Sequence, residues 1–537
     1  MKSSPRAPSL AGTENETERS KSFPTGAFFT ALVIVLFAAV RLWRLTATCL
    51  WFDEIFGIHA ARHGWTELLR FVAADIIHPP LFYLLLKIWI GIGGESLTWL
   101  RLLPAVCAIA AVVPFVLLCR ALELKQTERN LALLLLAVNG YLIKYAQELR
   151  MYSLLMFLSL CSLWLFIKFF KAEQGSRKQL LWLLLLNLLL VYSHYAGWLV
   201  VILEGSALAI WQRRKAARFL AGAAITILAY APWVFLVIQK AEAGKGLAQN
   251  IGWVSRPTFW DLTQLYALLN KPFWFIQSSA ARPFDQLTAL LSLLILGVPL
   301  LLLTVRLWRT GGHVKGAPVN PLRALFLLAL APVLIVFGLS WLLPQSIWGS
   351  RHLIIVAAPY SILAAVAIIR LPRYWIKIAT CFILGAWLLL AGIAWSLARP
   401  QPYIWCQWEP LARQVQLSNP RPTEEIRVYA FEDLIAYHVW FAFSSLHADQ
   451  FKVAVIKDVP GIQEDAAYFL PRRFNEIAVM NSAQISGNEI WIAFRASDWN
   501  EMAPPLSAFK NMGYAAKNVY SAQAQGQQAF MVRMVRN

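Results

Sequence analysis

The sequence predicts an α-helical polytopic membrane protein with about eleven transmembrane helices, followed by a small soluble α/β domain. Of its 537 residues, 58% are hydrophobic and only 15% are charged, which is more apolar than soluble domains are. A bilayer core about 30 Å thick requires roughly 20 apolar residues for each helical crossing, and such runs recur along the membrane part. We therefore expect a cytoplasmic tail over 1–25, a membrane domain over 26–397 and a soluble domain over 398–537, where the composition becomes polar.

The basic residues predict how the chain crosses the bilayer, because short loops rich in Lys and Arg remain in the cytoplasm. The self-consistent set of spanning helices lies near 26–46, 97–119, 130–146, 151–170, 179–196, 198–212, 217–238, 286–307, 323–343, 352–370 and 375–397. The non-cytoplasmic connections are then 47–96, the links near 147–150 and His194, the loop 240–285, the loop 344–351 and the soluble domain. The segment 81–92, about 12 residues long, is too short to span comfortably, so we predict an interfacial or re-entrant helix there.

The formal net charge of +20 does not indicate a nucleic-acid partner, because the basic residues lie at the ends of apolar runs and form no single stripe. The first apolar run, 27–40, follows a basic tail as a signal peptide would. The basic segment 41–44 stands where a small-residue cleavage site would be, so we predict a retained first helix. The six cysteines show no CxxC spacing, and we expect neither a zinc site nor a disulfide framework.

Two adjacent carboxylates, Asp53 and Glu54, follow the first helix in an apolar, aromatic segment. Neighbouring side chains on a helix point about 100° apart, so the two acids are expected to have different roles. A solvated helix N-terminus is the alternative explanation, because acids are favourable there. Trp51 and Phe56 leave little polar surface for such a turn, and we predict that Asp53 and Glu54 are catalytic.

A second acidic segment places Asp75 three residues before His78, which precedes two prolines. The prolines hold His78 in an extended conformation, in which it and Asp75 can line the mouth of a pocket. A plain helix start with Asp75 as its cap explains the same residues equally well.

A third polar segment, between two apolar helices, contains Gln147, Glu148, Arg150 and Tyr152. Gln147 and Arg150 share a face if the turn is helical, and a planar guanidinium can hold a phosphate with two hydrogen bonds. A lone arginine at a membrane interface often only reaches towards lipid headgroups. Basic residues are otherwise scarce on this side, so we predict a phosphate-binding role for Gln147 and Arg150, and substrate contacts for Glu148 and Tyr152.

Two further segments reach the same side of the membrane. Arg351 and His352 end one loop, and Arg351 is a candidate second phosphate ligand. His194 lies among tyrosines, where a histidine is more often structural than functional. P-loop, GxGxxG, HExxH and GxSxG motifs are absent from the sequence, so nucleotide binding, zinc proteolysis and serine hydrolysis receive no support. The Asp, Glu and His side chains of this side are suitable ligands for a divalent cation, but their spacing specifies none.

Taken in order, these motifs resemble bacterial members of glycosyltransferase family 39, which are relatives of the dolichyl-phosphate-mannose protein mannosyltransferases and the lipid A aminoarabinose transferases. The motifs are Trp-Phe-Asp-Glu at 51–54, Asp-x-x-His-Pro-Pro-Leu-x-Tyr at 75–83, Gln-Glu-x-Arg-Met-Tyr at 147–152 and Arg-His-Leu at 351–353. The likeness is strongest over 40–155 and weaker to about 370, and the chain has His352 where the family pattern leads us to expect Tyr.

This resemblance implies the C-type glycosyltransferase fold in a bacterial inner membrane and a polyprenyl-phosphate-linked sugar as donor. Asp53 would be the general base that activates an acceptor hydroxyl, with inversion at the sugar. Arg150 and Arg351, with Gln147 or His78, would bind the lipid phosphate. Glu54 and Asp75 would position the base or the acceptor, which is a protein, a lipid or a glycan. The remaining substrate contacts would come from Glu148, Tyr152, His194 and His352.

Other classes of protein also use buried ionisable groups in a helical bundle. The alternatives are a transporter or lipid flippase, a lipid-phosphate phosphatase or O-antigen ligase, and a non-catalytic subunit of cell-envelope assembly.

In the soluble domain, strands are expected at 425–431, 451–456 and 489–494, with a helix at 433–444. A further helix at 505–512 would precede a final hairpin, and this domain either shapes the acceptor site or only covers the bundle.

Overall fold

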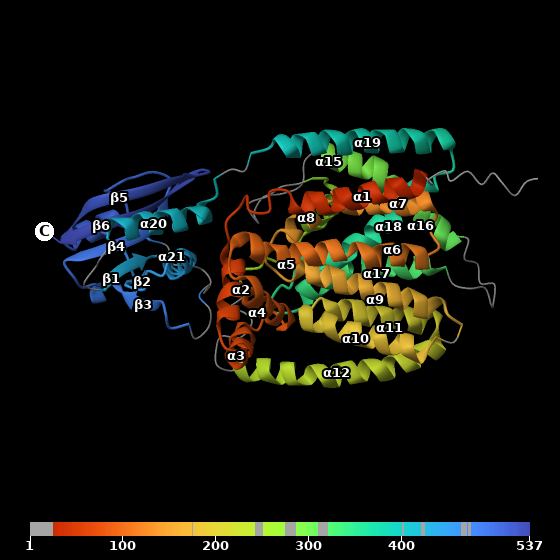
Figure 1. The fold of residues 1–537 in the computed structure, drawn as a ribbon, viewed down its shortest axis with the longest axis horizontal. Coiled ribbons are helices and arrows are strands. Elements are labelled where there is room, and N and C mark those ends of the chain that lie inside the picture. Colours follow the sequence, from red (N-terminus) through yellow and green to blue (C-terminus); the bar gives the residue numbers. More distant parts are fainter. Residues whose placement is uncertain are drawn as a thin grey trace, which may run out of the picture.

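The computed structural model describes residues 25–173, 175–241, 251–273, 286–309, 320–399, 402–419, 425–462, 470 and 474–536. These residues form a long helical bundle and a smaller sheet domain, which lie end to end (Figure 1). The predicted fold class is confirmed, because helices occupy each of the predicted membrane segments and a mixed α/β domain follows them.

The bundle contains these elements: α1 (Thr25–Leu42), α5 (Leu97–Ala110), α6 (Val112–Ala121), α7 (Gln126–Val138), α8 (Gly140–Ala146), α9 (Tyr152–Lys171), α10 (Arg177–Ser193), α11 (Gly197–Trp211), α12 (Arg213–Ala241), α14 (Phe259–Asn270), α15 (Gln286–Leu291), the π-helical turn η1 (Ser292–Gly297), α16 (Val298–Arg309), α17 (Pro321–Leu342), the 3₁₀ turn η2 (Ser350–Val356), α18 (Ala357–Ile369) and α19 (Tyr374–Leu397). Large apolar side chains such as Leu228 and Phe382 are more than 70% exposed on the outer helices, as lipid-facing residues are.

Seven of the described helical stretches are long and apolar enough to cross a membrane, fewer than the number of predicted crossings. The segment 126–146 shows the reason for one such difference. Asn139 interrupts it, because its side chain accepts a hydrogen bond from the Leu142 amide at 2.9 Å and starts the short helix α8. A polar cap inside an apolar run thus divides a predicted span into two shorter helices.

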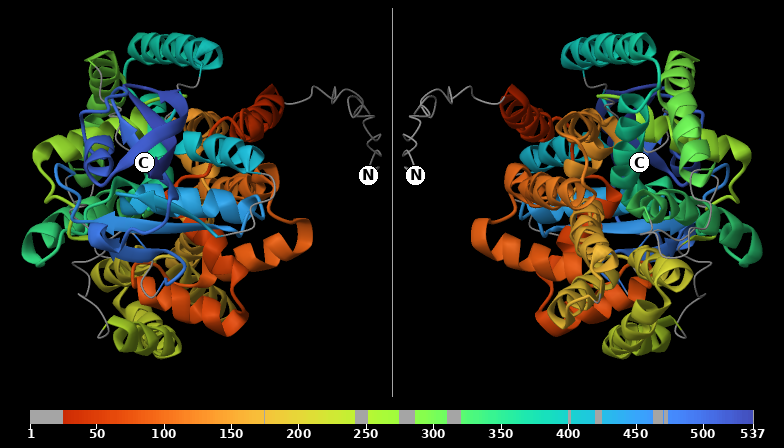
Figure 2. Two further views of the ribbon diagram at one scale, coloured as in Figure 1. Left: turned by 90° about the vertical axis from the view of Figure 1, so that its left-hand side faces the viewer. Right: turned by 90° about the vertical axis from the view of Figure 1, so that its right-hand side faces the viewer.

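Three short helices, α2 (Phe52–Arg62), α3 (Trp65–Asp75) and α4 (Leu81–Gly93), lie at the end of the bundle that faces the sheet domain (Figure 1). When the molecule is viewed along its long axis, α3 and α4 lie across that end (Figure 2). Gly94 ends α4 with a positive φ of 78°, a conformation in which glycine is favourable. Of these three helices, α2 packs against the sheet domain, where it contacts the helix Asp433–Ser445.

The sheet domain contains α20 (Trp408–Ser418), β1 (Ile426–Ala430), α21 (Asp433–Ser445), β2 (Phe451–Lys457), β3 (Ala478–Asn481), β4 (Glu489–Ala496), α22 (Leu506–Asn511), β5 (Tyr514–Ala524) and β6 (Gln527–Arg536). Its strand order is β3-β2-β1-β4-β6-β5. The first four strands in this order are parallel to one another, and β6 pairs antiparallel with both β4 and β5. The strands, helices and final hairpin predicted from the sequence correspond to elements of this domain, whereas α20 and β3 were not predicted.

A disulfide between Cys49 and Cys406 joins the segment before α2 to the sheet domain, with a Cα–Cα distance of 5.2 Å. The expectation that the cysteines form no disulfide is therefore wrong for this pair. The two cysteines are 357 positions apart, and spacing along the chain cannot show a pairing that tertiary structure creates. The hydroxyl of Tyr437 adds a contact at 2.9 Å from Nδ1 of His59, so polar and covalent contacts both hold the sheet domain on α2.

Candidate functional site

Asp53 lies in the first turn of α2, at the end of the bundle that faces the sheet domain (Figure 1). The turn begins at Trp51, whose extended backbone is followed by helix and whose amide donates to Glu54 Oε2 at 3.1 Å. The Asp53 carboxylate is thereby directed to Arg351, whose Nη1 donates to Oδ2 at 3.0 Å. This ion pair brings together two residues that are 298 positions apart.

Arg150 lies on the other side of the same carboxylate. Its Nη2 is 4.0 Å from Asp53 Oδ2, and its Nη1 donates to the Asp53 backbone carbonyl at 2.9 Å. The Tyr83 hydroxyl, on α4, lies 3.4 Å from Nη1, and the His78 ring lies 3.4 Å from Nη2. The guanidinium is almost wholly buried, and its Nε has no hydrogen-bond partner within the described part of the chain. Two arginines therefore flank one carboxylate, as the sequence motifs predicted.

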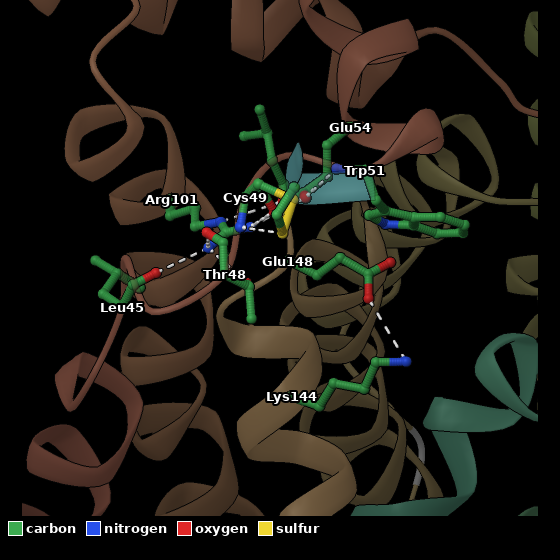
Figure 3. Close-up of polar contacts among 10 residues, drawn as sticks. Leu45, Thr48, Cys49, Trp51, Glu54, Arg101, Lys144 and Glu148 are labelled. Carbon is green, nitrogen blue, oxygen red and sulfur yellow. Dashed lines mark hydrogen bonds and ion pairs between the residues drawn. A yellow bond between two sulfur atoms is a disulfide. The ribbon is translucent and has the colours of Figure 1, made fainter. Parts of the chain in front are cut away.

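Glu54 is placed quite differently from its neighbour Asp53. Its side chain is 1% exposed and forms a salt bridge at 3.1 Å with Arg101, a residue of α5 that is equally buried. Glu54 Oε1 also accepts the Leu149 amide at 2.8 Å, so this carboxylate ties α2 to the turn that precedes Arg150. Figure 3 shows Arg101 in turn donating to the carbonyls of the segment 45–49. These contacts are those of a positioning residue.

Gln147 was predicted to bind phosphate, and the structure gives its amide another use. Its Nε2 donates to the Arg41 carbonyl at 3.1 Å and to the Trp43 carbonyl at 2.7 Å, at the C-terminal end of α1. An amide nitrogen has two hydrogens, and both are used here. The structure thus leaves no Gln147 hydrogen for a phosphate.

The rings of three histidines lie near one another, starting with His78 beside Arg150. The rings of His78 and His194 have centroids 5.5 Å apart, and those of His194 and His352 are 5.0 Å apart. His194 Nδ1 accepts the Ala196 amide at 3.0 Å, so its proton is on Nε2, which is buried and has no partner within the described residues. Asp75 lies 3.7 Å from His78. The structure therefore brings every predicted histidine to the same place.

Glu148 and Tyr152 complete the set that the sequence predicted. Glu148 is 8% exposed and its Oε1 has no hydrogen-bond partner in the described structure; the Tyr152 hydroxyl is also buried and unpartnered. Oε2 of Glu148 lies 3.9 Å from the ammonium of Lys144, a residue of α8 that the sequence reasoning did not single out. Burial raises the pKa of Glu148, while the charge of Lys144 opposes the shift. Glu148 Oε1 and the Tyr152 hydroxyl thus leave hydrogen-bonding capacity unused beside Arg150.

The electrostatic balance of Asp53 differs from that of Glu148. Burial by itself would raise the pKa of Asp53, but the charges of Arg150 and Arg351 outweigh it and lower that pKa from the ordinary value of 3.8. Burial and the neighbouring Arg150 lower the pKa of His78 well below its usual range. At neutral pH the site consequently holds an ionised Asp53, a neutral His78 and two cationic arginines.

Arg101, Lys144 and Tyr83 take part in the site, although sequence reasoning gave them no role. Arg101 had a detectable signal, because it is a charged residue inside the apolar helix α5, and such residues usually have a specific partner. Glu204 is a similar case inside the bundle. Its buried carboxylate accepts the Ser162 hydroxyl at 2.7 Å and the Asn187 amide at 2.8 Å, which joins α9, α10 and α11 away from Asp53.

A separate cleft of about 740 Å³ opens between α2 and the sheet domain. It is bordered by the Cys49–Cys406 disulfide and lined by Arg62, Glu95 and His438. Asp53 is not among its lining residues. Among the residues that the structure describes, no group of three or more His, Cys, Asp and Glu is arranged to hold a metal ion.

No protein-family model matches the sequence, and no curated protein matches it either. Solved structures do match its fold. ArnT from Cupriavidus metallidurans bound to undecaprenyl phosphate superimposes with a TM-score of 0.57 at 11% identity, over 94% of this chain and 97% of that chain. The apo state of the same protein gives a TM-score of 0.54 at 13% identity, over 94% and 97% of the two chains.

The archaeal oligosaccharyltransferase AglB from Archaeoglobus fulgidus gives a lower TM-score of 0.48 at 13% identity, over 78% of this chain. This chain spans 63% of the length of AglB. The likeness to ArnT extends over both the bundle and the sheet domain. The chain has the C-type glycosyltransferase fold of a multi-pass membrane protein.

Proposed function

We propose that this protein is a membrane glycosyltransferase that moves a sugar from a polyprenyl-phosphate donor to an acceptor hydroxyl or phosphate on the non-cytoplasmic face of a bacterial inner membrane. The observation that carries the proposal is the ionised Asp53 carboxylate between the buried guanidinium of Arg150 and that of Arg351. A base between two phosphate-binding cations suits displacement of a lipid phosphate from a sugar. The ArnT structure of the same fold, solved with undecaprenyl phosphate, supports this choice of donor.

In the proposed reaction, Asp53 accepts the proton of an acceptor hydroxyl as that oxygen forms a bond to the anomeric carbon. The bond from the anomeric carbon to the phosphate oxygen breaks, and its electron pair leaves with the lipid phosphate. Arg150 and Arg351 stabilise the charge that develops there, in a site of low dielectric. A phosphate is already a good leaving group, so no second acid is needed, and a single displacement inverts the sugar.

Other buried groups extend the phosphate site. Tyr152 and His194 each offer a buried donor without a partner in the described structure, and His78 lies beside Arg150. A buried donor left unpaired costs about 1–3 kcal/mol, so a ligand that fills these positions is favoured. We assign the phosphate to these donors and give Glu54 and Asp75 positioning roles.

The basic residues and the disulfide indicate on which side of the membrane the proposed active site lies. Helix α9 begins at Tyr152, beside Asp53, and its last turn carries Lys168 and Lys171. At 1.5 Å per residue, this 20-residue helix places those lysines about 30 Å from the site. The disulfide Cys49–Cys406, at the Asp53 end, is a feature of oxidising compartments. Both observations favour an active site outside the cytoplasm.

The test is Asp53→Asn in proteoliposomes with polyprenyl-phosphate donors that carry a radiolabelled sugar. We expect transfer to fall by about 10²–10⁴-fold, the usual contribution of a general base. Binding of bare undecaprenyl phosphate should be retained or strengthened, because Arg351 loses its competing carboxylate. Glu67→Gln, at an exposed position of α3, is the matched control and should transfer normally. Wild-type transfer by Asp53→Asn would contradict the proposal.

A further inference from the structure

The Glu148 carboxylate has an unused acceptor next to the proposed phosphate site. It lies in the turn between α8 and α9, two positions before Arg150, and is 8% exposed. Oε1 has no hydrogen-bond partner within the described residues, and Oε2 is 3.9 Å from Lys144 Nζ, too far for a normal hydrogen bond. A buried acceptor in this condition indicates a donor that is supplied by a ligand.

The backbone of Trp51 is anchored beside the chain segment that carries Glu148. The amides of Trp51 and Leu149 both donate to the Glu54 carboxylate, at 3.1 and 2.8 Å, so the two chain segments share one anchor. Figure 3 shows the Glu148 carboxylate directed to the Lys144 ammonium, and Trp51 bound through its amide to the Glu54 anchor. The Trp51 side chain is partly exposed, and the contacts that fix its position are made by its backbone.

These three side chains have the chemistry of a sugar subsite. An indole face packs against the C–H groups of a sugar ring, a carboxylate accepts from hydroxyls, and an ammonium donates to them. A second phosphate is disfavoured beside Glu148, because like charges repel. Neutral hydroxyl groups satisfy Oε1 without that penalty.

The position of the group agrees with this chemistry. Trp51 is two residues before Asp53 in the chain, and Glu148 lies close enough to Asp53 and Arg351 for their charges to act on its carboxyl group. We infer that Trp51, Glu148 and Lys144 bind the hydroxyl-bearing ring of the donor sugar. The inference rests on the proposed function and assigns to these residues the recognition of the sugar, separately from that of the lipid phosphate.

The test measures how tightly the full-length protein in nanodiscs binds lipids with and without a sugar. The probes are undecaprenyl phosphate, undecaprenyl phosphoglucose and undecaprenyl phosphomannose. Wild-type protein should bind at least one sugar-linked lipid about tenfold more tightly than the bare lipid. Glu148→Gln and Trp51→Ala should remove most of that advantage and change the binding of the bare lipid by less than about twofold. Trp51→Phe, which keeps an aromatic face, should retain most of it.

Arg150→Ala separates failure of this inference from failure of the proposed function. It should weaken all three lipids alike, because it removes a phosphate contact. If Arg150→Ala leaves every lipid unaffected, the proposed donor is wrong. If it weakens all of them while Glu148→Gln and Trp51→Ala retain the sugar advantage, the subsite is wrong and the proposed function stands. A wild-type protein with no preference for either sugar-linked lipid also overturns the subsite. Lys144→Met, which removes the ammonium 3.9 Å from Glu148 Oε2, repeats the test if Glu148→Gln fails to fold.

Discussion

Substitution of Glu54 by glutamine tests whether adjacent acids in this protein have separate roles. The Glu54 carboxylate accepts four hydrogen bonds, from two nitrogens of Arg101 and from the amides of Trp51 and Leu149. Glutamine keeps one acceptor oxygen and places an N–H₂ group where the other was. The Arg101 guanidinium, 3% exposed, then keeps only neutral partners, chiefly backbone carbonyls.

The magnitude follows from burial at both ends of the pair. Removing one partner of a buried ion pair costs about 3–5 kcal/mol of unfolding free energy, because the other charge stays buried and uncompensated. Glu67→Gln removes a pair whose side chains are 56% and 59% exposed, and should change the unfolding free energy by less than about 0.5 kcal/mol. Comparing the unfolding free energies of Glu54→Gln and Glu67→Gln thus separates the effect of breaking a buried ion pair from the effect of losing one negative charge.

The assay is SDS-induced unfolding in mixed micelles, followed by tryptophan fluorescence, together with undecaprenyl phosphate binding. Glu54→Gln should also weaken lipid binding, since the Leu149 amide that it releases adjoins Arg150. The double variant Glu54→Leu with Arg101→Leu should recover part of the stability, because it leaves no buried charge. A Glu54→Gln protein as stable as Glu67→Gln would refute the assignment of Glu54 as the anchor of this turn.

Three further predictions concern the donor, the base and the disulfide. Arg150→Ala should raise the KM for the lipid-phosphate donor by a factor at least about ten times larger than the factor for the acceptor. An equal change in the two KM values would count against Arg150 as a phosphate ligand. Because the pKa of Asp53 is lowered from 3.8, the base is ionised above that pH, and the transfer rate should fall only as the pH drops below about 4; an acidic limb centred near pH 6 would exclude Asp53 as the base. Denatured wild-type protein should expose four thiols to a labelling reagent before reduction and six after it, whereas Cys406→Ser should expose five in both states and unfold about 2–4 kcal/mol more easily.

Much of the fold follows from composition and periodicity, which are local properties of the chain. Long apolar runs predicted the positions of the bundle helices, and short apolar runs predicted β1, β2 and β4 of the sheet domain. The interruption at Asn139 was missed, because one polar residue alters an apolar average only slightly while its side chain is able to cap a helix.

The sequence also identified the residues that gather around Asp53. Motifs at four separated places contain Asp53, His78, Arg150 and Arg351, and the structure places these side chains in contact. This success has a physical reason: charged residues beside a bilayer are costly unless they have a use, so their positions are informative without any coordinates.

Only the tertiary structure decided how those residues are used. Glu54 and Asp53 are adjacent in sequence, yet one carboxylate faces Arg101 in the protein interior and the other faces Arg351. The Gln147 amide is directed to backbone carbonyls, and Cys49 meets Cys406 from the far end of the chain. A sequence determines which groups are present and which helices form. The partner of each buried group depends on packing between distant segments, because hydrogen bonds and ion pairs act over only a few ångströms.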